Sequence, residues 1–188
     1  MDKGVRLMKK NLFLILTIII VSLLLPVFAS SMEYLHKLEV KNLQFSWTVE
    51  EDQIHVKLSA KTTGWVAIGF YPEKAMGGAN IIIGAVKDGK VKIEDHYANR
   101  SRGHSNDEKL GGKNDVLNPS GSEENGVTTI TFTLPLDTGD KFDKPINPEG
   151  SSKIMLAYGS GRDSFKTRHP FRTIYGINFS TGETKKIK

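Results

Sequence analysis

The hydrophobic residues of this chain come in short runs that turn residues separate. Between residues 43 and 179 no window keeps a helical period for three turns, which excludes a helical bundle and favours strands. A set of short, regularly interrupted runs predicts an all-β fold, an antiparallel β-sandwich of immunoglobulin-like general architecture with long loops. The eight runs expected to be strands are 43–49, 53–61, 65–70, 80–87, 90–97, 127–134, 153–158 and 172–179.

Residue patterns within these runs indicate which faces are buried. Alternation in 53–58 places every second side chain inward and leaves His55 on the outer face. The continuous apolar run 80–86 predicts a central strand covered on both faces. Two long polar stretches, 98–125 and 137–152, are expected to be loops, and their length makes them candidates for function.

The first 29 residues have the three parts of a secretory signal peptide. Basic residues come first, an apolar run follows at 12–25, and Val27-Phe28-Ala29 suits a peptidase site. An uncleaved anchor through 11–29 is the alternative, because this segment reaches the lower limit of spanning length. The expected organisation is therefore a signal peptide at 1–29, a linker at 30–42, a sandwich at 43–180 and a basic tail at 181–188.

The net charge of +5 at first suggests nucleic acid as a partner. The signal segment, however, contains four basic residues and Asp2, so its removal lowers the net charge to +2. We therefore expect no nucleic-acid partner and a secreted or extracytoplasmic domain. Membrane contact is expected only if the N-terminal segment stays attached.

The chain contains no cysteine. This excludes disulfides, thiolate zinc sites, iron–sulfur clusters and covalently attached haem. The sequence also has no G-x-S-x-G, H-E-x-x-H or Walker motif, so catalytic residues are predicted to be absent and the chain is not expected to be an enzyme by itself. Asp137, Asp140 and Asp143 lie in one loop and offer oxygen ligands for calcium, although aspartates in such loops also serve turns.

Methionine and histidine are the remaining candidates for metal ligation. Met155 is expected in the core, since its neighbours in the strand are apolar. Met76 differs because it lies in a loop before Gly77-Gly78, where a large flat ligand has room to approach, although residue type alone still favours core packing. The five histidines form no closely spaced ligand motif; His96, beside Asp95, is interpreted as a hairpin edge and His104 as a loop residue.

An ordered set of motifs across the mature chain resembles the DOMON family. The match extends over about residues 43–179, and the ordered set is more specific than any one of its parts. The matching segments are 64–70 (GWVAIGF), 76–80 (MGGAN), 95–97 (DHY), Asp107, 128–132 (TTITF), 136–138 (LDT) with Asp140, and 168–172 (RHPFR).

The resemblance implies a β-sandwich that binds one b-type haem noncovalently, as in cytochrome-type members such as the cytochrome domain of cellobiose dehydrogenase. Carried over by position, the axial iron ligands are Met76 and His169, and a Met/His pair is a known haem ligand set. Arg168 and Arg172 flank the histidine and are candidates for pairing with haem propionates. Tyr97 is a further candidate for a propionate hydrogen bond. The two axial ligands are far apart in sequence, and we expect their two loops to meet at one end of the sandwich.

A haem with both axial positions filled has no open site for substrate, which suits one-electron transfer or redox sensing rather than catalysis. The expected partner is a separate redox protein, either soluble or membrane-bound. The alternative function is an extracellular module that binds a carbohydrate or another small ligand without redox activity, as some family members do. A domain whose haem site has lapsed is also compatible with the sequence.

Overall fold

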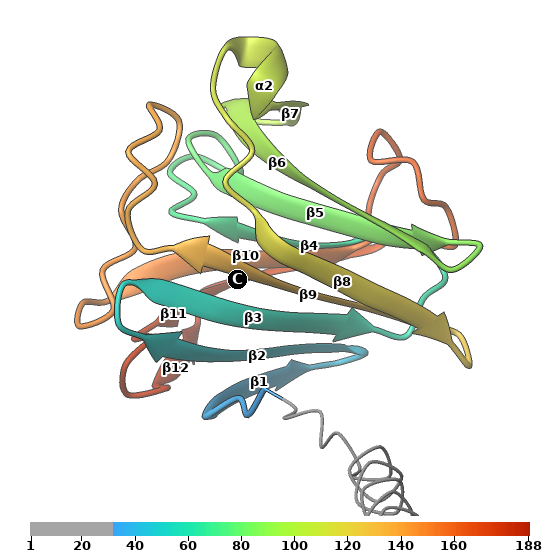
Figure 1. The fold of residues 1–188 in the computed structure, drawn as a ribbon, viewed down its shortest axis with the longest axis horizontal. Coiled ribbons are helices and arrows are strands. Elements are labelled where there is room, and N and C mark those ends of the chain that lie inside the picture. The colour runs from blue at the N-terminus through green and yellow to red at the C-terminus, as the bar shows by residue number, and fades with distance from the viewer. Residues whose placement is uncertain (1–31) are drawn as a thin grey trace, which may run out of the picture. The chain divides into compact units, whose positions relative to one another are not determined.

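The computed structural model of this protein describes residues 32–188, and the expected signal peptide lies outside the described residues (Figure 1). Within this part of the chain, strands account for nearly all of the regular structure and a single short helix accompanies them. The elements are β1 (His36–Val40), β2 (Leu43–Glu50), β3 (Gln53–Ala60), β4 (Val66–Phe70), β5 (Asn80–Lys87), β6 (Lys90–Arg100), β7 (Gly103–Asn106), α2 (Asp107–Leu110), β8 (Leu117–Glu124), β9 (Val127–Pro135), β10 (Ser152–Tyr158), β11 (Phe171–Ile177) and β12 (Thr184–Lys186).

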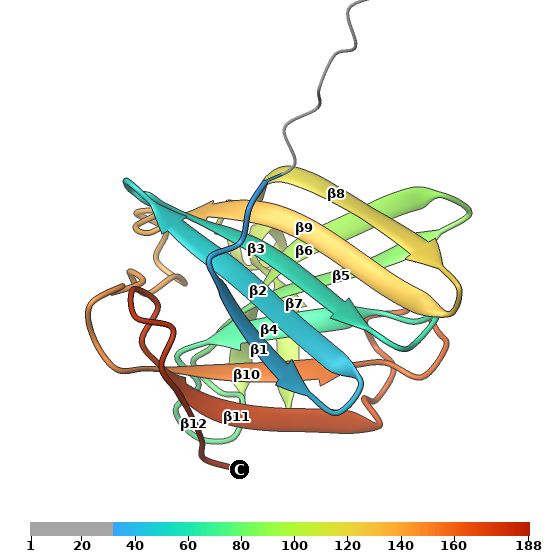
Figure 2. The ribbon, with the colours of Figure 1, turned by 90° about the horizontal axis from the view of Figure 1, so that it is seen from below.

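The strands form two antiparallel sheets packed face to face, as the views in Figures 1 and 2 show. One sheet has the order β1-β2-β3-β9-β8 and the other has the order β12-β11-β10-β4-β5-β6-β7. The predicted β-sandwich is thereby confirmed. No helix within residues 32–188 has the length and the apolar character needed to cross a bilayer.

The main core fills the space between the two sheets. Ile54, Val56 and Leu58 of β3 are fully buried in it, while His55 faces outward and contacts the Thr133 hydroxyl at 2.9 Å, as the alternation predicted. Trp47 is also fully buried, and its indole N–H donates to the Phe179 carbonyl oxygen at 2.9 Å. This bond satisfies the polar atom of the ring, so the whole indole is buried at no hydrogen-bonding cost.

All eight predicted strands are present, with ends shifted by a few residues. The sequence missed four others because their residues do not look like strands. β1 lies in the expected linker, β12 in the expected tail, and β7 and β8 in the expected long loop. β8 reads LNPSGSEE and is almost entirely exposed; it forms a sheet edge, where proline is tolerated, with an irregular register between Leu117 and Ser120.

Candidate functional site

A second group of apolar side chains covers the outer face of the seven-stranded sheet. In β4, Val66 and Ile68 point into the main core, whereas Ala67 between them belongs to this second group. We call the group the outer cluster; its buried members are Trp65, Ala67, Ala79, Ile81, Ile83, Ala85, Ala98 and Ala157, and Met76, Met155 and Phe165 pack against them. β4 and β5 are therefore buried on both faces, as predicted for the run 80–86.

Small side chains make up most of this face. Five of its eight buried members are alanines. Gly69 lies among them, and a Cβ atom there would be 3.0 Å from the Met155 methyl group, closer than side chains pack. Met155 was expected in the core, and it packs against this second buried group and not between the two sheets. Its strand neighbours Ile154 and Leu156 point inward, so alternation turns Met155 outward onto this face.

Two loops flank the outer cluster from opposite ends of the sheet. In the register, Phe70 at the end of β4 pairs with Ile154, while Val66 at its start pairs with Tyr158 at the end of β10. The β4–β5 loop (71–79) and the β10–β11 loop (159–170) therefore leave the sheet in opposite directions, as Figure 1 shows. The expectation that the loops of Met76 and His169 meet at one end is wrong, because β4 and β10 are antiparallel neighbours.

Met76 lies in the β4–β5 loop, half-buried against the outer cluster. A tight turn holds it there: the Gly77 N–H donates to the Lys74 carbonyl at 3.0 Å and the Ala79 N–H donates to the Met76 carbonyl at 3.1 Å. Gly78 has a φ of 79°, which favours glycine. The thioether is therefore set by the backbone at the edge of an apolar face.

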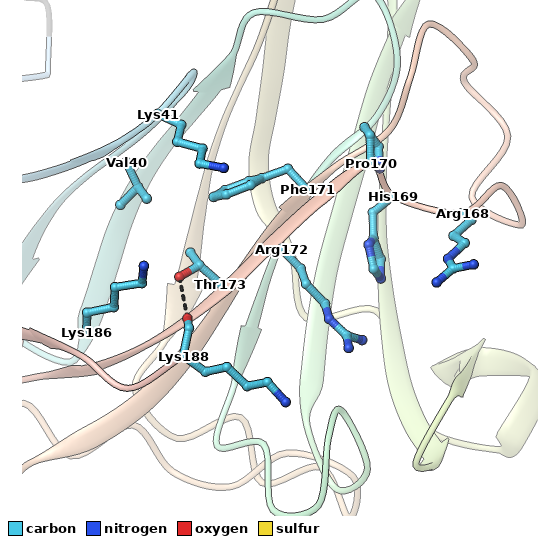
Figure 3. Close-up of a pocket in the computed structure, with 10 residues that line it drawn as sticks. All are labelled: Val40, Lys41, Arg168, His169, Pro170, Phe171, Arg172, Thr173, Lys186 and Lys188. Atoms are coloured by element: carbon cyan, nitrogen blue, oxygen red, sulfur yellow. Dashed lines mark hydrogen bonds between the residues drawn. The ribbon is translucent and has the colours of Figure 1, made fainter.

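His169 lies in the β10–β11 loop and lines a pocket of about 420 Å³. In Figure 3 the side chains of His169 and Arg172 extend to one side of β11, and those of Phe171 and Thr173 to the other. Arg172 pairs with Ala157 of the outer cluster, so His169 and Arg172 lie on the outer side of the sheet. The ten residues that line the pocket are Val40, Lys41, Arg168, His169, Pro170, Phe171, Arg172, Thr173, Lys186 and Lys188.

Charge makes this pocket suitable for an anion. Five of its ten lining residues are lysine or arginine, and none is acidic. Partial burial lowers the pKa of His169, and the neighbouring Arg172 and Arg168 lower it further. The imidazole is therefore neutral at pH 7, the state that a metal ligand requires. Within residues 32–188 its ring forms no hydrogen bond to another side chain.

The β10–β11 loop also contacts the outer cluster directly. The Trp65 indole N–H donates to the Thr167 hydroxyl at 3.0 Å, and Phe165 packs against the cluster. The loop that carries His169 is therefore tied to the face on which Met76 lies.

Tyr97 is not brought to the other predicted site residues. It pairs with Asn80, whose neighbour Phe70 belongs to the main core, so Tyr97 faces away from the outer cluster. Its ring stacks on Phe142 at 4.9 Å between centroids. The predicted contact of Tyr97 with a group on the outer face therefore has no support in the fold.

The sequence missed a pair of histidines on the outer face. His96 pairs with Ile81 of the outer cluster, and its Nδ1 lies 2.7 Å from Nδ1 of His104. Its other ring nitrogen lies 2.7 Å from the Glu94 carboxylate, so both nitrogens are engaged. Burial lowers the pKa of His104 to about 4, which keeps that ring neutral. Alternation of side chains along β6 is the sequence signal that could have predicted His96 on this face.

The fold and this face define a β-sandwich domain whose outer cluster of small apolar side chains lies between the loop that carries Met76 and the loop that carries His169. The chain belongs to the DOMON family: the DOMON domain model matches residues 39–159, a segment that contains Met76 and ends before His169. The resemblance seen in the motifs is confirmed.

Known proteins with similar sequences are larger. The chain is 31% identical over 112 residues to human DBH-like monooxygenase protein 1 and 27% identical over 112 residues to the mouse protein of that name. The matched part is 60% of this chain but 18% of each of those proteins, so the chain spans under a fifth of their length.

Among solved structures, the cytochrome b domain of pyranose dehydrogenase from Coprinopsis cinerea has a similar fold. The TM-score is 0.58 at 15% sequence identity, over 78% of this chain and 82% of that one. At this identity the likeness shows a shared fold.

Proposed function

We propose that this chain is an exported b-type cytochrome domain that binds one noncovalent haem, with Met76 and His169 as axial ligands. The observation that carries the proposal is the outer cluster, an apolar group of small side chains that the Met76 thioether packs against and that the loop carrying His169 contacts through Phe165 and Thr167. The similar fold of a cytochrome b domain supports the same function.

The residues fit this cofactor in three respects. Gly69 and the alanines keep the outer cluster low in side-chain bulk, so a flat ring that displaces the covering Phe165 and Met155 side chains would find the apolar surroundings that a noncovalent haem needs. Met76 and His169 offer a soft thioether and a neutral imidazole. Arg168 and Arg172 are exposed cations at the pocket beside this face, suited to pairing with propionate carboxylates.

When bound, the haem supplies one-electron chemistry. The chain itself contributes a methionine ligand, which raises the reduction potential, and an apolar face that excludes water and acts in the same direction. An exported electron carrier needs a second redox protein as donor or acceptor. The cationic rim around His169 is suited to an acidic surface on that protein.

A second candidate function is a module that binds a small anionic ligand without redox chemistry. The observation that favours it is the pocket of about 420 Å³ with its five lysine and arginine residues. In this alternative the arginines hold the ligand and the outer cluster serves only to fix the loops.

Haem titration of the full chain distinguishes the two. The protein is purified from haem-sufficient cells, and absorption spectra are recorded oxidised and after dithionite. The proposal expects a Soret band with sharp low-spin bands in the reduced form, and Met76→Leu and His169→Ala lose the low-spin bands. A chain that binds no haemin, or whose spectrum neither substitution alters, contradicts the proposal.

Two matched variants control for nonspecific effects. Met155→Leu removes the other thioether on the same face and is expected to leave the spectrum unchanged; if it abolishes the low-spin bands while Met76→Leu does not, the assignment of Met76 is wrong. His55→Asn removes a histidine on the outer face of the other sheet and is expected to have no spectral effect.

A further inference from the structure

Three aspartates from distant parts of the sequence meet at one end of the sandwich. Asp95 is in β6, Asp107 begins α2, and Asp143 is in the β9–β10 loop. One carboxylate oxygen from each lies within 4.8 Å of those of the other two. We call these three residues the acidic cluster. Asp95 and Asp107 are 0% and 1% exposed, so two of these carboxylates are withdrawn from water.

Each member of the acidic cluster has an oxygen without a hydrogen-bond partner. The unpartnered atoms are Oδ1 of Asp95, Asp107 and Asp143. The second oxygen of two of them is bonded: the Asp115 N–H donates to Oδ2 of Asp95 at 3.4 Å, and the Thr138 hydroxyl donates to Oδ2 of Asp143 at 2.9 Å. These donors fix the orientation of the carboxylates and leave one oxygen of each available.

Among residues 32–188, no lysine, arginine or histidine forms an ion pair with this group or with Asp115. Burying several carboxylates together without a counter-charge is strongly unfavourable, because both desolvation and mutual repulsion oppose it. A bound metal cation supplies the missing charge and the missing ligand for each unpartnered oxygen.

The surrounding loops are built to hold this arrangement. Asp140 accepts from the Lys113 N–H at 2.7 Å and from the Phe142 N–H at 2.8 Å, and it thereby joins the loop after α2 to the β9–β10 loop. Gly112 permits this junction, since a Cβ there would lie 2.8 Å from the Phe142 ring. Asp140 is therefore a structural tie whose two oxygens are already bonded.

The donor set selects the type of ion. All available ligands are carboxylate oxygens, which exclude soft metals and favour calcium or magnesium. Three carboxylates, with Asp115 nearby, exceed the one or two that magnesium sites use, and calcium takes this larger number of oxygen ligands. Asp143 is only half-buried, which leaves access for the ion and for water ligands.

We propose that Asp95, Asp107 and Asp143 bind one calcium ion, with Asp115 at the rim, and that this ion joins the two sheets at this end of the sandwich. Asp95 belongs to a strand of the seven-stranded sheet, and Asp143 follows β9 of the five-stranded sheet. The site shares no residue with the outer cluster, so it stands independently of the haem proposal.

The sequence pointed to calcium at Asp137, Asp140 and Asp143, and only the last of these belongs to the acidic cluster. Asp137 is exposed and accepts from the Gly139 N–H at 3.0 Å, a local turn bond. Asp137 is therefore a matched control for Asp143, since both lie in one loop and carry the same charge.

The test is thermal unfolding of the full chain, stripped with EGTA, as calcium chloride or magnesium chloride is added. Calcium at about a hundred times its dissociation constant is expected to raise Tm by roughly 5–10 °C for a domain of this size. Asp95→Asn and Asp143→Asn are expected to abolish the shift, and Asp137→Asn is expected to keep it. The absence of a calcium shift in the wild-type chain, or an equal shift with magnesium, overturns the proposal.

The variants in EGTA give a second, independent readout. Asp95→Asn removes a buried ionisable carboxyl group but retains an acceptor oxygen for the Asp115 N–H, so its Tm in EGTA is expected to equal or exceed that of the wild type. If Asp95 instead served only to stabilise the metal-free fold, Asp95→Asn would lower Tm in EGTA, and that result overturns the proposal. Isothermal titration of the wild-type chain with calcium measures the stoichiometry, expected to be one.

Discussion

The outer cluster and the acidic cluster lie on opposite sides of the seven-stranded sheet and differ in every property that selects a ligand. The outer cluster is apolar, contains two thioethers, and extends between loops from opposite ends of the sheet. The acidic cluster consists of carboxylates within 4.8 Å of one another at one end. The first suits a large flat group with a soft metal, and the second suits a single hard ion.

The two regions also differ in how they tolerate an absent ligand. Phe165 and Met155 pack against the outer cluster, so this face is covered without any cofactor. The acidic cluster, in contrast, contains carboxylate oxygens that have no hydrogen-bond partner in the protein. We therefore expect haem removal to change spectra more than stability, and calcium removal to do the opposite.

The largest expected effect is that of His169→Ala on haem binding. Loss of an iron ligand is expected to lower haem affinity by about 100-fold or more, since even residues that only support a ligand change metal affinity by 10–100-fold. Haemin titration followed at the Soret band measures this. The calcium-induced rise in Tm is expected to be unchanged in this variant; a reduced rise would mean that the two regions are coupled.

Calcium removal is the reciprocal experiment and has the next largest expected effect. In haem-loaded protein, EGTA is expected to lower Tm by roughly 5–10 °C while the reduced spectrum keeps its band positions. Calorimetry and absorption on the same sample measure both quantities. A spectral shift on chelation would show that the calcium site positions a haem ligand.

The pH dependence of the calcium-free protein follows from the acidic cluster. Burial, together with the neighbouring carboxylates, raises the pKa of Asp95 to about 9 and that of Asp107 to about 7, and burial raises the pKa of Asp143 to about 6. A carboxyl with a raised pKa binds its proton more tightly in the folded chain than in the unfolded chain, which titrates near pH 4. The acidic cluster therefore contributes a fall in stability in EGTA as pH rises from about 4 to 9; the lowered pKa of His104 opposes it between about pH 4 and 6.5, so the fall is expected above pH 6.5. Calcium is expected to make this decrease in stability smaller at the upper end of the pH range. Asp95→Asn is expected to make the decrease smaller in EGTA.

The smallest expected effect concerns the hydrogen bond between Trp65 and Thr167. Thr167→Val leaves the indole N–H unpaired and is expected to cost about 1 kcal/mol of the free energy of unfolding. Because this bond ties the β10–β11 loop to the outer cluster, haem affinity should fall several-fold as well. Urea unfolding and haemin titration measure the two effects, with Thr131→Val on the other sheet as the control.

The sequence predicted the fold because period-2 alternation and turn residues are local properties. It missed β8 because Pro119 and a row of polar residues read as a loop, and only pairing with β9 makes them a strand. Met155 was assigned to the core because its neighbours in the strand are apolar. Side chains in a strand alternate between the two faces, and since Ile154 points between the sheets, Met155 points to the outer face.

The candidate sites were predictable to different degrees. Met76 and His169 were proposed through the family resemblance, and no spacing rule joins two loops at opposite ends of a sheet. The acidic cluster was not foreseen, since Asp95, Asp107 and Asp143 come from three separate segments and only the packing of the β9–β10 loop brings them together. Tyr97 was proposed from the family resemblance without regard to its strand face, and the register turns it away from the outer cluster.

The central claim is tested most directly by the dithionite-reduced absorption spectrum of the full chain purified from haem-sufficient cells. We predict a low-spin b-type spectrum that Met76→Leu and His169→Ala abolish and that Met155→Leu and His55→Asn preserve. A folded, colourless chain that haemin does not convert to this spectrum would contradict the claim and favour the small-anion module.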